Sequence, residues 1–175
     1  TVHGTFIKTH SVYLTDLFPY IVCRKKSKRL EEILVARRAT LFKELRKNIF
    51  PIQTHDAFTI HGIHLPKDLH SLVAYDEIIS AGLGFVCLLV MMCSKYLSIP
   101  LRHRLIFNSS RSAVRDCDLG IFPLFKERVV EKDQFDRAIV LLNRNIDHLL
   151  QSQGVQIRER SHMLEKLELL LDHLI

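Results

Sequence analysis

Residues 76–116 read DEIISAGLGFVCLLVMMCSKYLSIPLRHRLIFNSSRSAVRD, and this stretch decides the fold. Between residues 78 and 93 its only polar side chain is that of Ser80. A helix that is apolar on nearly all sides is buried, either in a protein core or in a membrane. A membrane span needs about 20 apolar residues, and charged residues close this run early on both sides. The pattern therefore predicts a buried helix over residues 75–97 at the centre of an α/β core.

Two glycines, Gly82 and Gly84, lie inside this predicted helix. Each costs about 1 kcal/mol relative to alanine in a helix interior, so we expect another backbone to pack closely against them. They do not form a dinucleotide-binding fingerprint, because no strand precedes them and no third glycine stands at the required place.

The spacing of the apolar residues changes after Pro100. Segment 101–107 (LRHRLIF) alternates in the manner of a strand, with apolar side chains on one side and arginines on the other. The apolar side would carry Leu101, Leu105 and Phe107, and the other side Arg102 and Arg104. Residues 108–110 are turn formers, and residues 113–114 are expected to begin a return strand. Residues 122–125 (FPLF) are expected to form an apolar anchor in a loop.

Strand and helix signals flank this centre. Residues 58–66 (FTIHGIHLP) alternate around Gly62 and predict a β-hairpin. Residues 132–151 have apolar positions at helical spacing, and Gly154 is expected to end that helix. A last helix is expected over residues 161–174, with Ser161 as N-cap. The apolar positions are Phe135, Ile139, Leu142, Ile146, Leu149 and Leu150 in the first helix, and Met163, Leu164, Leu167, Leu170, Leu171 and Leu174 in the second.

The order of these elements predicts an α+β fold. Short antiparallel strands would pack with long helices in β-sheet–α-helix repeats. A chain of 175 residues, 47% of them hydrophobic, can bury one good core. Charged residues make up 25%, which is ordinary for a globular domain and argues against disorder.

A basic amphipathic helix is expected ahead of this domain, over residues 27–48. Leu30, Leu34, Leu41 and Leu45 are spaced by 4, 7 and 4 residues, which keeps them on one narrow stripe. Charged residues cover the other faces, as at the end of a coiled coil. Pro51 follows closely, where prolines commonly stop helices.

The first residues are harder to place. Residues 2–14 are rich in Thr, Val, Phe, Ile and Tyr without a helical stripe, so a strand or extended arm is expected there. Pro19 is expected to interrupt what precedes it, and no secretory signal pattern is visible. The predicted division is an arm over 1–26, the basic helix over 27–50, and the α/β domain over 51–175.

Positive charge is concentrated in the predicted basic helix. Residues 24–47 contain ten Lys or Arg and three Glu, a net +7, against +6 for the whole chain. Such a segment either contacts an acidic surface (lipid, nucleic acid or an acidic partner) or is a solvated helix face. There is little aromatic interleaving and no zinc-finger or RNA-binding motif, which leaves a nonspecific electrostatic role toward nucleic acid at most.

The four cysteines, Cys23, Cys87, Cys93 and Cys117, show no metal or disulfide spacing. Cys87 and Cys93 lie in the apolar run and are expected to be inert buried thiols. Cys117 and His103 are the one candidate nucleophilic pair, which would make the protein a cysteine-dependent hydrolase. No motif in the sequence would activate the Cys117 thiol.

Ten histidines raise the question of a metal site. His61 and His64 flank the Gly62 turn, with His55 and His70 nearby, and alternation with apolar residues explains them as an outward, solvated face. No ligand spacing accompanies them, so no metal and no cofactor are expected. The serines at 109, 110 and 112 are expected to form a plain turn rather than a phosphate nest.

Five segments occur in a recognisable order: FKELRKNIFPI, FTIHGIHLP, the stretch from Ser80 to Asp116, FPLF and QFDRAIVLLNRNI. This order resembles the C-terminal domain of the UV radiation resistance-associated protein (UVRAG) family, over residues 41–150. A weaker version of the order resembles the β–α repeated domain of Beclin. The most specific parts are residues 96–102, 110–112 and Phe135-Asp136.

The resemblance implies a noncatalytic regulatory subunit of the class III phosphatidylinositol 3-kinase complex, acting in autophagy and endosomal trafficking. In that family a coiled coil pairs with a Beclin-type subunit, which links it to the lipid kinase and its regulatory kinase subunit. The location implied is cytoplasmic and peripheral on endosomal and autophagic membranes. The implied partner-binding residues are Leu30, Ile33, Leu34, Leu41 and Leu45.

One departure from the Beclin pattern concerns the membrane. The Beclin domain carries an aromatic finger, whereas the matching loop here, residues 126–133, has no aromatic residue and mixed charge. Membrane contact would then be electrostatic, through Lys25, Lys26, Lys28 and Arg29, each adding about 1 kcal/mol near an anionic surface. The alternative is a stand-alone basic module that binds anionic membrane or nucleic acid.

Overall fold

The structure is a computed structural model that describes residues 2–55, 57–69, 77–116, 120–126, 132–156 and 161–175, with side chains from residue 19 onward. The chain divides into two compact units, Thr1–Ala39 and Thr40–Ile175. We call the second unit the domain. Each unit is described by itself.

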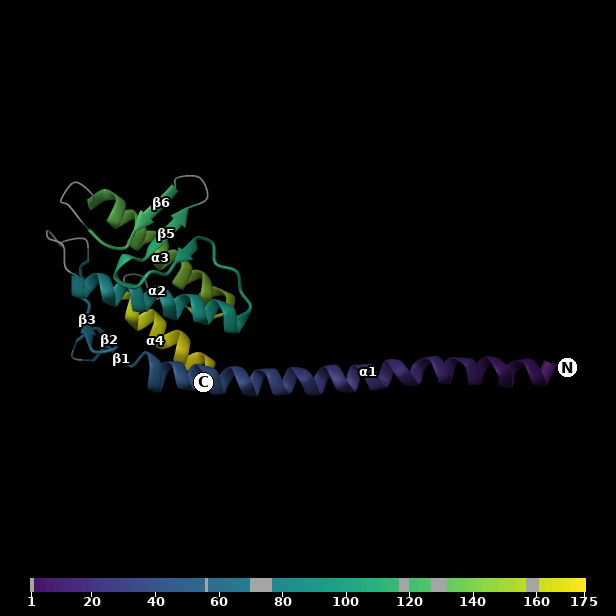
Figure 1. The fold of residues 1–175 in the computed structure, drawn as a ribbon. Coiled ribbons are helices and arrows are strands. Elements are labelled where there is room, and N and C mark those ends of the chain that lie inside the picture. Colours follow the sequence, from purple (N-terminus) through teal and green to yellow (C-terminus); the bar gives the residue numbers. More distant parts are fainter. Residues whose placement is uncertain (1, 56, 70–76, 117–119, 127–131, 157–160) are drawn as a thin grey trace. The chain divides into compact units, whose positions relative to one another are not determined.

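The first unit is helical throughout its described part, as the N-terminal ribbon in Figure 1 shows. Helix α1 spans Val2–Glu44, and Pro19 lies inside it. The expected strand or arm over residues 2–14 and the expected break at Pro19 are therefore wrong. Strand propensity depends on a neighbouring strand to pair with, whereas a helix satisfies its backbone hydrogen bonds within the segment. A proline inside a helix removes one such bond and costs about 3 kcal/mol without necessarily ending the helix.

The domain begins in the last turn of α1. The helix widens into a π-helical turn, Leu45–Ile49, which ends at Phe50. Phe42, Leu45 and Phe50 are fully enclosed in the core. The helix predicted over residues 27–48 is thus present, and Pro51 follows its end as expected.

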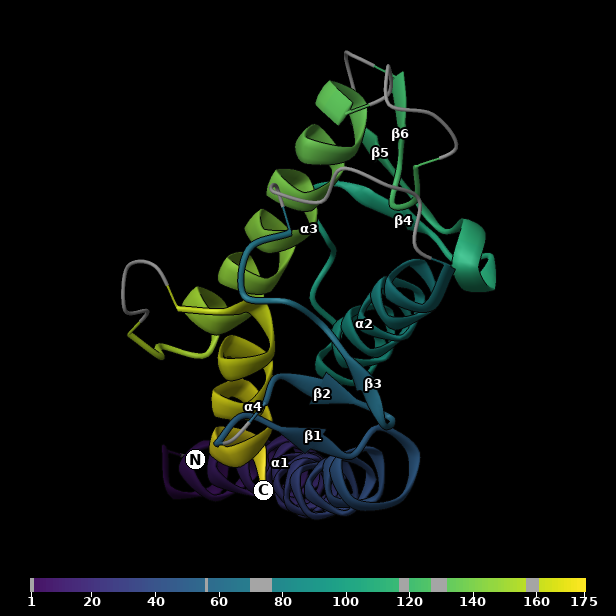
Figure 2. The same ribbon diagram turned by 90° about the vertical axis from the view of Figure 1, so that its left-hand side faces the viewer.

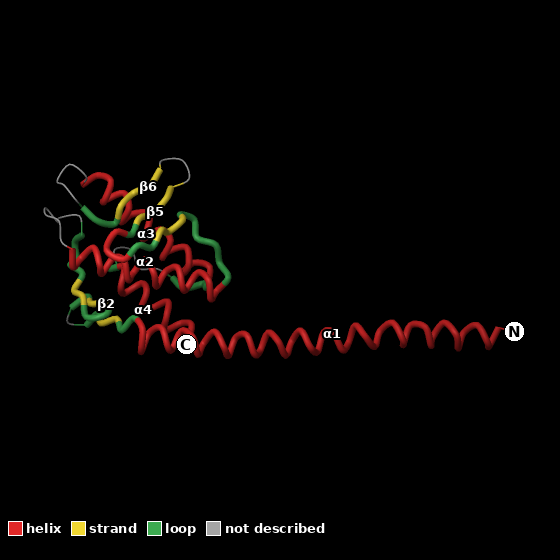
Figure 3. Tube along the Cα trace, in the orientation of Figure 1, coloured by secondary structure: helices red, strands yellow, loops and turns green. Residues whose placement is uncertain are grey.

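Two small antiparallel sheets alternate with the long helices of the domain, shown in yellow and red in Figure 3. The first sheet has the order β1–β2–β3, and the second β4–β5–β6. The predicted alternation of strands and helices is therefore confirmed. The strands are β1 (Ile52–Gln53), β2 (Thr59–Ile60), β3 (Ile63–His64), β4 (Arg104–Ile106), β5 (Ala113–Asp116) and β6 (Gly120–Pro123).

The first sheet contains the predicted hairpin. Strands β2 and β3 pair through Ile60 and Ile63. The two residues between them, His61 and Gly62, have φ values of 50° and 77°. Positive φ at both central positions is what a tight type I′ hairpin turn requires, and glycine adopts it without strain.

The second sheet corrects the prediction for residues 122–125. Phe122 and Pro123 belong to strand β6 rather than to a loop, and only Leu124 beyond the strand is a fully buried anchor. Proline is tolerated here because β6 is an edge strand and Pro123 is its last residue. A proline in an apolar run therefore does not exclude an edge strand.

Helix α2 (Glu77–Leu97) is the centre of the domain, as Figure 2 shows. Within the described residues it is the one helix long and apolar enough to cross a membrane, but 56% of its most apolar 18-residue window is buried inside the structure. The strands of both sheets and helix α3 pack against it. It is the predicted buried core helix.

Gly84 of α2 lies directly beneath the short 3₁₀ turn Ser109–Arg111. A Cβ atom on Gly84 would overlap the carbonyl oxygen of Ser109. The buried Ser112 hydroxyl fixes that carbonyl, to which it donates at 2.8 Å, while accepting from the Asn108 backbone N–H at 3.0 Å. The close backbone approach expected from this glycine is therefore present, and the serine cluster forms a structural turn.

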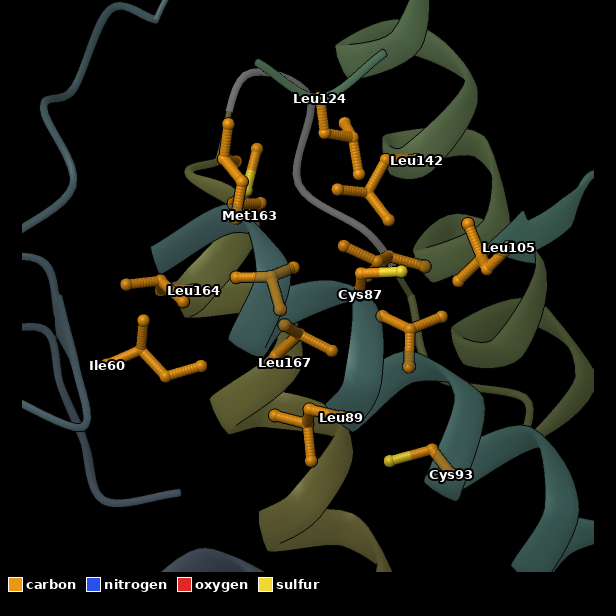
Figure 4. Close-up of a cluster of buried hydrophobic side chains, with 14 of the residues drawn as sticks. Ile60, Cys87, Leu89, Cys93, Leu105, Leu124, Leu142, Met163, Leu164 and Leu167 are labelled. Atoms are coloured by element: carbon orange, nitrogen blue, oxygen red, sulfur yellow. The ribbon is translucent and has the colours of Figure 1, made fainter. Parts of the chain in front are cut away.

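Helices α3 (Lys132–Ser152) and α4 (Met163–Leu174) complete the core. Figure 4 shows Ile60 of β2, Leu89 of α2, Leu142 of α3 and Leu167 of α4 converging in one cluster. Both predicted apolar faces are buried, apart from Leu174, which is half-buried at the chain end. Gly154, with φ of 71°, follows α3 as predicted.

The N-cap of α4 is His162 rather than Ser161. The Nδ1 atom of His162 accepts from the Leu164 backbone N–H at 3.2 Å, and Glu165 Oε2 accepts from the His162 backbone N–H at 3.0 Å. The imidazole stacks on Phe58 with 4.1 Å between ring centroids, and its Nε2 lies 3.3 Å from the Pro66 carbonyl oxygen. This packing holds the ring in place as the cap, which the serine beside it does not provide.

The cap predicts a pH dependence of stability. Burial lowers the pKa of His162, and His64 and Lys67 lower it further, against the raising effects of the Pro66 carbonyl and Glu165. The unfolded chain therefore binds more protons at this site, and its ordinary pKa is about 6.5. We expect the free energy of unfolding to fall as the pH drops below about 6.5, until the folded pKa is reached.

Urea unfolding between pH 7.5 and 5.5 measures this effect. A His162→Asn variant keeps a capping oxygen but does not titrate, so its stability should vary less steeply over the same interval. An equal slope in both proteins would assign the pH dependence to other groups.

Candidate interaction surface on helix α1

Helix α1 carries an exposed apolar stripe, formed by Cys23, Leu30, Ile33 and Leu34. At 3.6 residues per turn, Cys23, Leu30 and Leu34 fall within about 40° of one another around the helix, and Ile33 lies about 60° to one side. Leu30 is 65% exposed, Ile33 56% and Leu34 47%. Contiguous exposed apolar side chains are typical of interaction surfaces, which makes this stripe a candidate for one.

The helix itself argues for a partner. Most helical stability in proteins comes from packing of an apolar face, not from intrinsic propensity. Residues 23–37 are all exposed. A second helix on the stripe would supply the missing packing, in the geometry of a coiled coil.

Lys25 and Lys28 lie about 140–160° away from Leu30, on the opposite side of the helix. Arg29 lies at about 100° from it, whereas Lys26, at about 40°, falls within the stripe between Leu30 and Ile33. All four are exposed. The stripe and most of the basic cluster can therefore be engaged at the same time by different surfaces.

The remaining predicted partner-binding residues belong to the domain. Leu41 is half-buried, and Leu45 is only 1% exposed because it is enclosed in the domain core. Arg46 of the basic segment pairs with Glu168 at 3.3 Å and with Asp172, both on α4. We therefore assign Leu45 and Arg46 to the domain rather than to an outward surface.

The histidine cluster has the expected outward placement where it is described. His55, His61 and His64 are exposed, and His61 lies over Phe85 with 5.0 Å between ring centroids. His70 lies outside the described residues. No group of three metal-ligating side chains occurs among the residues that the structure describes.

The thiols of α2 are buried. Burial raises the pKa of Cys87 and of Cys93 to about 12, so both stay protonated and unreactive at neutral pH. Cys117, the other half of the weighed nucleophilic pair, lies outside the described residues. Its suggested partner His103 has Nδ1 3.3 Å from Asp116 Oδ1.

The loop compared with the aromatic finger is described only at its ends. Lys126 is buried, with its ammonium 4.5 Å from the centre of the Phe135 ring. It therefore forms a cation–π contact inside the domain instead of presenting charge to solvent. Residues 127–131 lie outside the described residues.

Two polar features were not expected from the sequence. Asn145 of α3 is fully buried and bonds both backbone groups of His103. Arg104 and Arg115 stand directly opposite each other on β4 and β5. The alternation of residues 101–107 predicted which side of the strand carries Arg104. No feature of the sequence predicted which residue of β5 lies opposite it.

The fold and this surface define the class: an α+β domain of β-sheet–α-helix repeats that follows a helix with an exposed apolar stripe. No protein-family model matches the chain. Curated proteins do match, and the chain spans only about a fifth to a third of their lengths.

The UV radiation resistance-associated protein of Mus musculus is 31% identical over 149 residues, which cover 80% of this chain and 21% of that protein. The vacuolar protein sorting-associated protein 38 of Schizosaccharomyces pombe is 29% identical over 153 residues, 82% of this chain and 31% of that protein. The UV radiation resistance-associated gene protein of Drosophila melanogaster is 27% identical over 147 residues, 72% of this chain and 21% of that protein. The chain belongs to the UVRAG family, as its motif order predicted.

Proposed function

We propose that this chain is part of a noncatalytic regulatory subunit of a class III phosphatidylinositol 3-kinase complex that acts in autophagy and endosomal trafficking. In this proposal helix α1 pairs with the coiled coil of a Beclin-type subunit, and through it with the lipid kinase and its regulatory kinase subunit. The chain holds subunits together, and phosphorylation of lipid is the work of the kinase. Its place is the cytoplasm, peripherally on endosomal and autophagic membranes.

The observation that carries the proposal is the exposed stripe of Leu30, Ile33 and Leu34, in a chain whose relatives belong to the UVRAG family. Fully burying one leucine or isoleucine side chain contributes about 1.5–3 kcal/mol. Three such side chains, already partly covered by their own helix, still offer several kcal/mol to a partner helix. That free energy would add to the contributions of the other contacts in a coiled-coil seam.

Co-purification with the coiled-coil segment of a Beclin-type subunit tests the pairing. In the double variant Leu30→Asp and Leu34→Asp, two carboxylates would have to be buried in the seam, which is strongly unfavourable without a partner charge. We expect its dissociation constant to rise at least about 100-fold, since 1.4 kcal/mol corresponds to a factor of ten.

The matched control is Ile21→Asp with Val35→Asp. These residues are also apolar and exposed, at 41% and 63%, but they lie about 140–180° from Leu30. They should leave the affinity within about threefold of the unchanged chain, since exposed substitutions away from an interface have small effects. Equal losses in both double variants would show that helix α1 does not pair through the stripe.

The second candidate is a stand-alone basic module, which the exposed Lys25, Lys26, Lys28 and Arg29 favour. Under the main proposal these residues add only a salt-sensitive contact with anionic lipid. Failure to pair with the Beclin-type coiled coil, together with vesicle or nucleic-acid binding that disappears when the four residues are changed to glutamine, would favour the second candidate.

A further inference from the structure

The outer face of the sheet β4–β5–β6 has an unusual row of side chains. The strand register places Arg104 opposite Arg115, and Arg115 opposite Ile121. Residues directly opposite each other point to the same side of a sheet. All three are exposed, Ile121 by 51%. The next row, Leu105, Val114 and Phe122, points the other way and into the core.

Two like charges directly opposite on neighbouring strands destabilise a sheet. The other strand positions on this face are Ile106, Ala113 and Pro123, none of them acidic. The nearby carboxylate of Asp116 belongs to the core side, within 3.4 Å of Arg137 on α3. Within the described part of the chain, Arg104 and Arg115 therefore have no acidic neighbour on their own face.

The presence of arginine rather than lysine on this sheet favours a carboxylate as the ligand. Residues 101–116 contain four arginines and no lysine, whereas Lys25, Lys26 and Lys28 dominate the basic cluster of α1. The planar guanidinium group binds a carboxylate with two parallel hydrogen bonds, whereas lysine acts as a point charge. Two guanidinium groups rising from opposite positions can each hold one carboxylate of a single short acidic segment.

We propose that this outer face is a docking surface for an acidic segment of a protein partner, whose carboxylates pair with Arg104 and Arg115 and whose apolar side chain covers Ile121. The inference is separate from the pairing of helix α1, because it uses no residue of that helix. A membrane is the less suitable occupant. Lipid recognition by basic residues depends on clusters of four to eight, while this face has two arginines beside an isoleucine.

The test uses the full chain with Lys25, Lys26, Lys28 and Arg29 changed to glutamine throughout, which lowers the net charge of residues 24–47 from +7 to +3 and with it the background binding by the helix. The probe is fluorescent poly-L-glutamate, followed by anisotropy. Adding Arg104→Glu and Arg115→Glu should weaken binding at least about tenfold, because truncating or reversing close interfacial charge pairs has effects of that size. The matched control, Lys95→Glu with Arg144→Glu, makes the same charge change on exposed helix positions and should have less than about threefold effect.

Thermal unfolding and vesicle binding are two further tests of the proposal. Without a ligand, Arg115→Gln should raise the thermal midpoint by about 1–2 °C, since it relieves the opposed charges. A lower midpoint would remove the repulsion on which the inference rests. Equal binding by the sheet variant and its control, or binding to phosphatidylserine vesicles in preference to poly-L-glutamate, would overturn the proposal. Success or failure here leaves the co-purification test of α1 unaffected.

Discussion

Replacing Gly84 with alanine is expected to lower the free energy of unfolding by about 3 kcal/mol, the upper end of the usual cost of overpacking. The new methyl group would overlap the carbonyl oxygen of Ser109. That carbonyl cannot move aside freely, because Ser109 has a φ of 49° and the buried Ser112 hydroxyl is bonded to it. The helix gains about 1 kcal/mol from alanine, so the expected net loss implies a steric cost of about 4 kcal/mol, above the usual range because the overlap is with a fixed backbone atom.

Gly82→Ala is the matched control in the same helix. Its added methyl group would meet side-chain carbons of Ile63 and Leu65, both at 2.9 Å. Side-chain ends can turn or shift, whereas the Ser109 backbone cannot, so we expect a loss of less than about 1.5 kcal/mol. For a chain of this length, thermal unfolding should separate the variants, with a midpoint about 6–12 °C lower for Gly84→Ala. If Gly82→Ala were the more damaging of the two, the tight contact would not be at the turn.

The hairpin at residues 58–66 and the apolar face of α3 could be predicted because local chemistry decides them. A two-residue turn with glycine predicts a hairpin, and a row of apolar side chains at helical spacing predicts an amphipathic helix. Strand β6 could not be recognised, because Pro123 fits a strand only at a sheet edge, and edges are defined by the other strands. Histidine is not among the usual N-cap residues, so the cap at His162 depends on its stacking with Phe58.

For the candidate surface on helix α1, too, the local pattern could be predicted from the sequence and the tertiary contacts could not. Spacing alone placed Leu30, Leu34 and Leu45 on one stripe, and periodicity does not distinguish a side chain that meets its own domain from one that meets another protein. The structure separates them, because Leu45 is enclosed and Leu30 is 65% exposed. Likewise, the sequence predicts a strand over residues 101–107, of which 104–106 form β4, but the opposition of Arg104 and Arg115 is a property of register between strands.

Asn145→Ala is expected to lower the free energy of unfolding by about 3 kcal/mol. The buried amide of Asn145 donates to the His103 carbonyl oxygen at 2.8 Å, and its oxygen accepts from the His103 backbone N–H at 3.0 Å. Alanine would leave two partly buried backbone groups without partners, each costing about 1–3 kcal/mol. This side chain ties the segment before β4 to α3, an attachment that no apolar contact could replace, because a backbone N–H and C=O need polar partners.

Asn143→Ala serves as the control, because it removes the same side chain two residues away on the same helix. The Asn143 amide is half-buried and donates only to the Ile139 carbonyl oxygen of its own helix, at 3.2 Å. That carbonyl already has the helical N–H as a partner, so the loss should stay within about 0.5 kcal/mol. Urea unfolding at pH 7.5 compares the two variants directly. Equal midpoints would mean that water satisfies the His103 backbone once Asn145 is gone, and that the clamp contributes little to holding β4 against α3.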